Sequence, residues 1–372
     1  MASVPTSPGV DRGALATRLR LAKLPALDGL RAIAVLLVIV YHFGIPGVPG
    51  AYGVVVFFVL SGFLITWLLL REIDRTGTIS FRGFYLRRSL RIFPAFYAYW
   101  LLLTGILLLT HRPVLWPHAW SAFFYVSNYY HAFFGDPSTG FSHTWSLAIE
   151  EQFYLLWPPL LLLLRRSRFG VARPLMAIIV CLWLYRAVAC YLFEVNQAYV
   201  YAAFDMRCDA LLVGCLLAVL LAAPGATHGH AAARWARLTE SPSLALVTTA
   251  ALVVVALGRV SGIPRYRDVV AFTLIPPLVA LLIAQLIAVS DTPMWRWVES
   301  APMRFLGRLS YSLYLYQQVT LEPARKLLRQ MPVGVQLAGA IALTVVVAAG
   351  SYYVVERPFL RLKERTAQQP AL

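Results

Sequence analysis

The chain has 372 residues, of which 59% are hydrophobic and only 13% are charged, and its mean hydropathy is +0.67. This composition excludes an ordinary soluble domain and indicates a polytopic membrane protein. The formal net charge is +16, but basic residues of membrane proteins gather in cytoplasmic loops, so we expect no nucleic-acid partner.

The sequence predicts an all-α fold with about ten transmembrane helices. We expect residues 1–23 to form a disordered cytoplasmic tail, residues 24–362 the transmembrane domain, and residues 363–372 a second cytoplasmic tail. The predicted spans lie near residues 28–45, 51–70, 92–110, 145–164, 174–193, 208–223, 242–258, 269–289, 304–321 and 334–355.

The loops between these spans differ in charge. With loops assigned alternately, one side holds roughly two dozen Lys and Arg residues and the other about eight. The richer side is cytoplasmic by the positive-inside rule, which predicts cytoplasmic termini and a multi-pass protein of the cell membrane. Two basic outer loops, residues 259–267 and 325–329, leave the last third of this topology open.

The first predicted span carries two ionisable residues, Arg31 and His42, eleven positions apart. This spacing brings both to nearly the same helix face, roughly 16 Å apart along the axis. An ionisable side chain inside a span is costly and indicates a functional site. The alternative is that Arg31 extends to the cytoplasmic headgroups and His42 lies at the outer interface.

The segments LDGLRAIAVLLVIVYH and GVVVFFVLSGFLIT resemble the opening of the acyltransferase-3 family of integral membrane O-acyltransferases, whose Arg and His, separated by ten residues, fall on Arg31 and His42. Further matching segments cover essentially the whole chain: FYLRRSLRIFPAFY, HTWSLAIEEQFYLLWP, FDMRCDALLVGCLLA, LGRLSYSLYLYQQ and VERPFLRL. One departure is Gln317, where many relatives carry His, so this side chain would act by hydrogen bonding without a titrating proton.

The resemblance implies transfer of an acetyl or short acyl group from acyl-CoA to a hydroxyl of a carbohydrate or glycosylated compound. The acceptor would be an envelope polysaccharide or a macrolide-type antibiotic, and we expect no permanently bound cofactor and no metal. The rival interpretation is a multi-span transporter of an acylated or anionic substrate, which the lack of matching Gly or Pro breaks in the two halves disfavours.

O-acyl transfer needs a base for the acceptor hydroxyl, and His42 is the best candidate because imidazole titrates near neutral pH. Glu150 and Glu151, after an outer loop, are expected at similar depth, where the carboxylate of one of them, with Glu150 preferred, could hold the imidazole tautomer. Alternatively, Glu150 and Glu151 stabilise the start of the fourth span through its dipole. Ser61 is a less favoured nucleophile, since Ser-Gly in a span usually serves packing.

Arg31, Arg88 and Arg91 lie toward the predicted cytoplasmic side, where acyl-CoA is available. Guanidinium groups suit phosphate oxygens, and Arg88 and Arg91 share a helix face. The sequence therefore predicts that these three arginines bind the donor, with Arg31 also near the chemistry.

Four further residues are candidates for binding the acceptor: Glu151, Asp205, Arg207 and Gln317. Asp205 and Arg207 could instead pair within the protein. The outer segment of residues 111–142 is dense in aromatic residues. It is either an interfacial or re-entrant helix in the aromatic belt or a lid that stacks against sugar or macrocycle rings.

Overall fold

The computed structural model describes residues 14–21, 23–223, 229–258 and 262–368, and throughout these ranges every regular element is a helix. The predicted all-α fold is therefore confirmed. The long helices are α2 (Pro25–Phe43), α3 (Ala51–Thr76), α4 (Phe81–Leu109), α7 (Thr144–Arg165), α8 (Ala172–Tyr191), α10 (Phe204–Ala222), α12 (Pro242–Leu257), α13 (Phe272–Val289), α14 (Ala301–Leu327) and α15 (Val333–Ser351).

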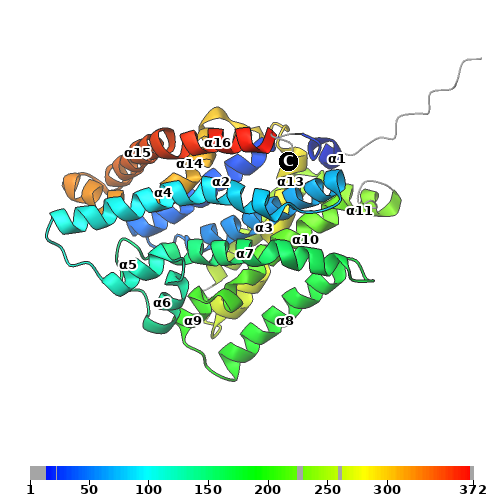
Figure 1. Cartoon of the computed structure of the whole chain (residues 1–372), viewed down its shortest axis with the longest axis horizontal. Helices are drawn as coiled ribbons and strands as arrows, with labels where there is room; N and C mark the ends of the chain where they lie inside the picture. The colour runs from blue at the N-terminus through cyan, green and yellow to red at the C-terminus, as the bar shows by residue number, and fades with distance from the viewer. Residues whose placement is uncertain (1–13, 22, 224–228, 259–261, 369–372) are drawn as a thin grey trace, which may run out of the picture.

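Shorter helices connect or extend them (Figure 1). They are α1 (Ala14–Arg18), α5 (Trp116–Phe123), α6 (Ser127–Phe134), α9 (Gln197–Ala202), α11 (Gly229–Thr239), the π-helices η3 (Tyr266–Ala271) and η5 (Tyr352–Glu356), the 3-10 helix η4 (Arg296–Glu299) and α16 (Arg357–Gln368).

Seven helical segments of the described chain are long and apolar enough to cross a membrane, and α11 with α12, bent by 63°, would make an eighth. A helix occupies each of the ten predicted spans, but α10 and α14 are not among these segments. The reason in α10 is its charge: Asp205, Arg207 and Asp209 lie in its first two turns. The chain is a multi-pass membrane protein, while the count of ten and the orientation remain predictions.

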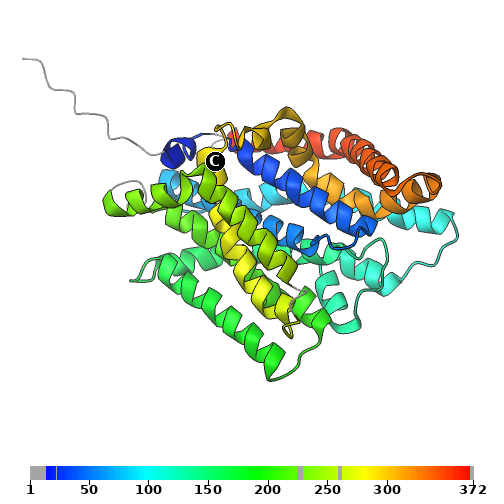
Figure 2. The same ribbon diagram turned by 180° about the vertical axis from the view of Figure 1, so that it is seen from behind.

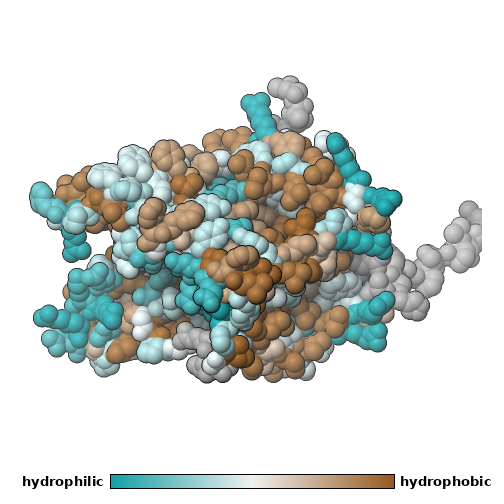
Figure 3. All heavy atoms as spheres, turned by 90° about the horizontal axis from the view of Figure 1, so that it is seen from below, coloured by the Kyte–Doolittle hydropathy of each residue, from teal (hydrophilic) through white to brown (hydrophobic). Residues whose placement is uncertain are grey.

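The surface agrees with this assignment. Seen from below in Figure 3, hydrophobic side chains cover much of the middle of the molecule, and hydrophilic side chains gather toward its two ends. The described ends of the chain, α1 and α16, lie at the same end of the bundle in both ribbon views (Figures 1 and 2).

The predicted disorder of residues 1–23 is wrong for its described part, while residues 1–13 lie outside the described residues. Helix α1 packs on α13 with Leu15 buried. Arg18 donates to Ser290 at 2.8 Å and forms ion pairs with Glu299 and Asp291, each at 3.0 Å. Burial of Leu15 and Leu19 and the ion pairs of Arg18 order the segment.

Helices α3 and α10 pack backbone to backbone, because each presents a glycine where the other approaches. A methyl group at Gly62 would overlap the carbonyl oxygen of Leu211, and one at Gly214 would overlap that of Val59. Small residues at such positions allow close approach of membrane helices. The Ser-Gly pair of α3 thus serves packing through Gly62, which leaves Ser61 on an adjacent face.

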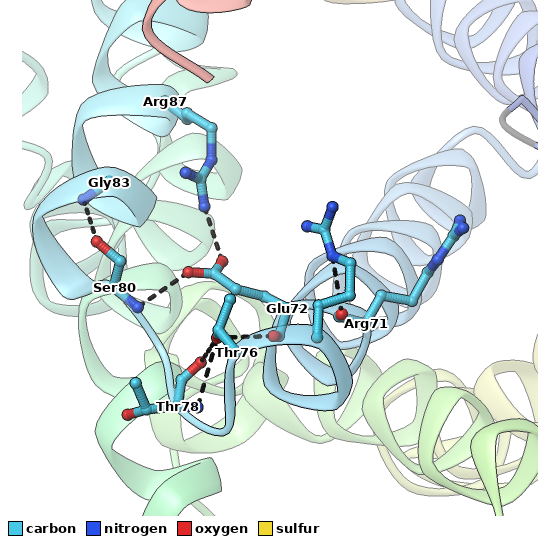
Figure 4. Close-up of polar contacts among 8 residues, drawn as sticks. Arg71, Glu72, Thr76, Thr78, Ser80, Gly83 and Arg87 are labelled. Atoms are coloured by element: carbon cyan, nitrogen blue, oxygen red, sulfur yellow. Dashed lines mark hydrogen bonds and ion pairs between the residues drawn. The ribbon is translucent and has the colours of Figure 1, made fainter. Parts of the chain in front are cut away.

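The turn between α3 and α4 is held by the Glu72 carboxylate (Figure 4). Glu72 accepts hydrogen bonds from the Ser80 backbone N–H and from Arg87, both at 2.9 Å. Gly77, at φ +80°, ends α3, and the Ser80 hydroxyl caps α4 by accepting from Gly83. These contacts fix the start of α4, which carries Arg88 and Arg91.

We expect Gly62→Ala to destabilise the protein by about 1–3 kcal/mol, because the new methyl group has no room against the α10 backbone. The unfolding midpoint of the purified protein in detergent measures this effect. Gly105→Ala is the matched control, since Gly105 of α4 has open space around it. Equal midpoints for both variants would contradict the tight α3–α10 contact.

Candidate active site

The first cavity, which we call the arginine cavity, has a volume of about 510 Å³ and lies between α2, α3, α4, α7 and α14. It gathers basic side chains from three helices: Arg31 of α2, Arg71 of α3, and Arg88 and Arg91 of α4. The three arginines predicted to bind the donor therefore line one space. Helix packing brings Arg31 to the other two, since more than fifty residues separate them in sequence.

The arginine cavity has an excess of positive charge. Its lining contains five basic residues, including Lys23, and three acidic ones, Asp28, Glu150 and Glu151. Arg31 pairs with Asp28 at 3.3 Å, and Arg88 stacks over the Tyr154 ring at 4.8 Å. Neither Arg88 nor Arg91 forms an ion pair within the described residues. Unpaired guanidinium groups in a cavity suit a ligand that carries phosphates.

Glu150 also faces the arginine cavity, where it accepts a hydrogen bond from the Ser61 hydroxyl at 2.7 Å. Glu151 lies beside it, and its Oε1 atom has no hydrogen-bond partner among the described residues. Ser61, predicted only as a less favoured nucleophile, is thus in contact with a carboxylate and open to the same space.

The second cavity, which we call the histidine cavity, has a volume of about 550 Å³ and includes His42 and His143 in its lining. His42 is at the last turn of α2 and is exposed to this space. Its Nδ1 atom lies 3.0 Å from the carbonyl oxygen of Val38. A carbonyl can only accept, so in the neutral ring Nδ1 carries the proton and Nε2 carries the lone pair.

The structure does not form the expected carboxylate–imidazole pair, because Glu150 and His42 line different cavities. Helix α7 begins at Thr144, so Glu150 lies nearly two turns into the helix, about 9 Å from its start. His42 faces the histidine cavity instead, and the Val38 carbonyl performs the orienting role predicted for the carboxylate.

The first turn of α7 and Tyr314 of α14 separate the two cavities. Tyr314 and Ser146 line the arginine cavity, whereas His143 and Trp145 line the histidine cavity. The Tyr314 hydroxyl donates to the His143 carbonyl oxygen at 2.9 Å and lies 2.7 Å from the Ser146 hydroxyl. The partition is therefore about one helical turn thick and is held by hydrogen bonds.

The remaining predicted binding residues lie outside both linings. Asp205 accepts from the hydroxyls of Tyr185 at 2.9 Å and Tyr199 at 3.3 Å. Arg207 is buried, with its guanidinium 3.5 Å from the centre of the Phe272 ring. Within the described residues Asp205 and Arg207 do not pair with each other, and the Nε and Nη2 atoms of Arg207 have no hydrogen-bond partner.

Gln317 is fully buried next to His42, and its amide forms no hydrogen bond of standard geometry within the described residues. It lies on α14, three residues beyond Tyr314, and its neighbour Gln318 lines the histidine cavity.

The aromatic segment forms α5 and α6, and it contributes polar rather than aromatic side chains to the histidine cavity: His131, Asp136, Ser138, Thr139 and Ser142. Trp120, Phe124, Phe133 and Phe134 are exposed on the surface. The segment therefore covers part of the cavity, but its aromatic rings are not in the described lining. This arrangement favours the interfacial interpretation for the rings.

A buried pair of histidines supports this segment. The Nε2 atoms of His118 and His131 are 3.1 Å apart, and His118 Nδ1 lies 2.9 Å from the Thr139 hydroxyl. One of the two Nε2 atoms must carry a proton and the other a lone pair for this contact to be a hydrogen bond. The pair is therefore stable only while at least one ring is neutral.

Sequence reasoning missed the roles of His143 and Tyr314, although both lie in segments that carry the family resemblance, HTWSLAIEEQFYLLWP and LGRLSYSLYLYQQ. It also missed the buried ion pair of Arg186 and Asp209 at 2.9 Å, which links α8 to α10. No spacing within one helix signals these contacts, because each joins residues of two different helices or a helix and a loop.

A family model for the acyltransferase domain, acyltransferase-3, matches residues 24–355. The chain belongs to this family. The match covers all the residues that line the two cavities except Leu21 and Lys23, which line the arginine cavity.

The chain is 31% identical over 357 residues to "Putative peptidoglycan O-acetyltransferase YrhL" of Bacillus subtilis, covering 90% of this chain and 54% of that protein. It is 33% identical over 353 residues to "Putative O-acetyltransferase SACOL0978" of Staphylococcus aureus, covering 90% and 57%. "Peptidoglycan O-acetyltransferase OatA" of Listeria monocytogenes is 38% identical over 212 residues, covering 52% and 33%. The chain spans about half the length of the first two relatives. No solved structure matches it.

We expect thermal stability to fall between about pH 6.5 and pH 4 because of the His118–His131 pair. Burial, and next the charge of His131, lower the pKa of His118 from 6.5 to about 4, and burial lowers the pKa of His131. Below the ordinary pKa the unfolded chain binds more protons, so acid favours unfolding.

The unfolding midpoint measured against pH tests this expectation. The His118→Gln variant lacks one of the two imidazoles that take up a proton on unfolding, so its unfolding midpoint should fall less steeply over the same pH range. A variant with the slope of the wild type would show that other groups cause the loss.

Proposed function

We propose that this acyltransferase-family protein transfers an acetyl or another short acyl group from acyl-CoA to a hydroxyl of a glycan. One observation carries the proposal: unpaired arginines line one cavity, and a histidine with a free Nε2 lone pair lines the cavity on the other side of a thin partition. Such a division suits a charged donor on one side and a hydroxyl-bearing acceptor on the other.

The donor would bind in the arginine cavity. Acyl-CoA carries a pyrophosphate and a further phosphate, and Arg88 and Arg91 offer guanidinium groups without acidic partners in the described residues. Arg31 lines the same cavity from α2, and its charge is only partly neutralised by Asp28 at 3.3 Å. Glu151 would accept a hydrogen bond from the pantetheine arm, since its Oε1 atom is otherwise unpaired.

The acyl group would then extend past Tyr314 toward His42. Arg31 and His42 are eleven residues apart on α2, roughly 16 Å along the axis, which is comparable to the reach of a pantetheine arm. His42 would act as the general base, because its Nε2 lone pair can take the proton of an acceptor hydroxyl. We assign Glu150 to the donor cavity, where it binds Ser61.

The acceptor would occupy the histidine cavity. Its lining combines the rings of Trp145 and Tyr201, whose centroids are 4.7 Å apart, with hydroxyl, amide and carboxylate groups. Aromatic faces with nearby polar groups suit a sugar ring. Two of the three relatives described above are named as peptidoglycan O-acetyltransferases, which favours an envelope glycan over a macrolide as the acceptor class.

We expect His42→Ala to lower acceptor-dependent release of CoA thiol from acetyl-CoA roughly 100- to 10,000-fold, because it removes the general base. Binding of acetyl-CoA should persist, since His42 is outside the arginine cavity. The assay uses purified protein in detergent with a panel of peptidoglycan fragments and macrolides.

His111→Asn is the control, because this exposed residue has φ +52° and Asn tolerates that conformation. Thiol release by His42→Ala at the wild-type rate would remove His42 from the chemistry. A wild-type protein that neither binds nor turns over acyl-CoA would instead favour the transporter interpretation.

We expect Arg88→Gln and Arg91→Gln each to raise the Kd for acetyl-CoA roughly 10- to 100-fold, the usual effect of losing a charged hydrogen bond. Equilibrium binding to the purified protein measures this change. Arg82→Gln, an exposed arginine on the same helix, should leave the Kd unchanged. Unaltered affinity in both cavity variants would argue against a donor site between these arginines.

A further inference from the structure

His143 is a buried imidazole that none of the steps above uses. The residue lines the histidine cavity together with His42 and is only 2% exposed. Neither ring nitrogen has a hydrogen-bond partner among the described residues. A buried polar group without a partner costs about 1–3 kcal/mol, so its retention at a cavity wall points to a partner supplied by a ligand.

The ring is held in place without using its nitrogens. Its edge-to-face neighbours are Tyr99, at 5.4 Å between centroids, and Tyr314, at 5.3 Å. The Tyr314 hydroxyl also donates to the His143 backbone carbonyl at 2.9 Å. Packing and the backbone therefore fix the imidazole, and its two buried nitrogens form no hydrogen bond of standard geometry within the described residues.

The environment keeps this imidazole neutral. Burial, and next the charge of His42, lower the pKa of His143 to about 3, against a smaller opposing effect of the Gly140 backbone. At neutral pH the ring thus presents one N–H donor and one lone pair. A neutral imidazole can polarise a carbonyl without supplying a charge, whereas His42 must accept a proton in the same cavity.

We propose that His143 donates a hydrogen bond from its neutral imidazole to the carbonyl oxygen of the transferred acyl group, and so stabilises the oxyanion of the tetrahedral intermediate. The assignment rests on the proposed function. The thin partition places His143 next to the path from the arginine cavity, because Tyr314 contacts both this residue and Ser146 of the donor side.

The step balances with the two histidines in separate roles. The acceptor oxygen forms a bond to the thioester carbon while its proton moves to His42 Nε2, and the carbonyl electrons move to the oxygen that accepts from His143. Collapse restores the carbonyl, breaks the carbon–sulfur bond and releases the CoA thiolate, which takes the proton from His42. The His143 N–H donates throughout and transfers no proton.

The test compares His143→Ala, His143→Gln and the His111→Asn control in the thiol-release assay, together with acetyl-CoA binding, the unfolding midpoint and the pH–rate profile. We expect His143→Ala to lower kcat roughly 100- to 1,000-fold, the effect of removing one oxyanion donor. The His143→Gln variant keeps an N–H donor, so its kcat should be at least tenfold higher than that of His143→Ala. In both variants the affinity for acetyl-CoA should not change, and neither should the limb of the pH–rate profile that the titration of His42 sets.

Three results would overturn the assignment. Activity of His143→Ala within threefold of the wild type would show that the ring is not needed. A glutamine variant as inactive as alanine, with a shifted pH limb, would make His143 a titrating base. Loss of acetyl-CoA binding and a lowered unfolding midpoint would make its role structural. If the wild type shows no acceptor-dependent thiol release, the proposed function fails first, and this inference fails with it.

Discussion

The cost of burying charge in an apolar helix bundle is the constraint on which the arrangement of this protein depends. Arg31, Arg88 and Arg91 lie on helices whose other faces are apolar, and a guanidinium cannot lose its proton to avoid that cost. The bundle accommodates all three around one cavity of about 510 Å³. The proposed donor site follows from this arrangement, because a cavity lined by several guanidinium groups can bind the phosphates of the donor.

Close helix packing sets the walls of this space. The α3–α10 contact depends on Gly62 and Gly214, which let two backbones approach without side chains between them. Ser61 is then turned toward α7, where its hydroxyl meets Glu150 at 2.7 Å. A single Ser-Gly dipeptide thus supplies a packing surface on one face of α3 and a polar contact to the cavity on the other.

The two histidines that line the histidine cavity have different surroundings. His42 is at the end of α2, and the Val38 carbonyl fixes its tautomer. His143 precedes the first turn of α7 and is held by aromatic rings and by its own backbone. One imidazole keeps a free lone pair toward an exposed cavity, and the other has no polar partner of its own. Similar residues in one cavity can therefore serve as base and as neutral donor.

Local features of the sequence determined the helical fold, the positions of the long helices and the eleven-residue separation of Arg31 and His42, because hydrophobic runs and helix geometry act over short distances. The family motifs identified the arginines. Tertiary structure alone decided that Glu150 meets Ser61 rather than His42, because α7 begins at Thr144 and carries Glu150 deeper into the bundle. It also decided that Tyr314 separates two cavities, since that contact joins residues 171 positions apart.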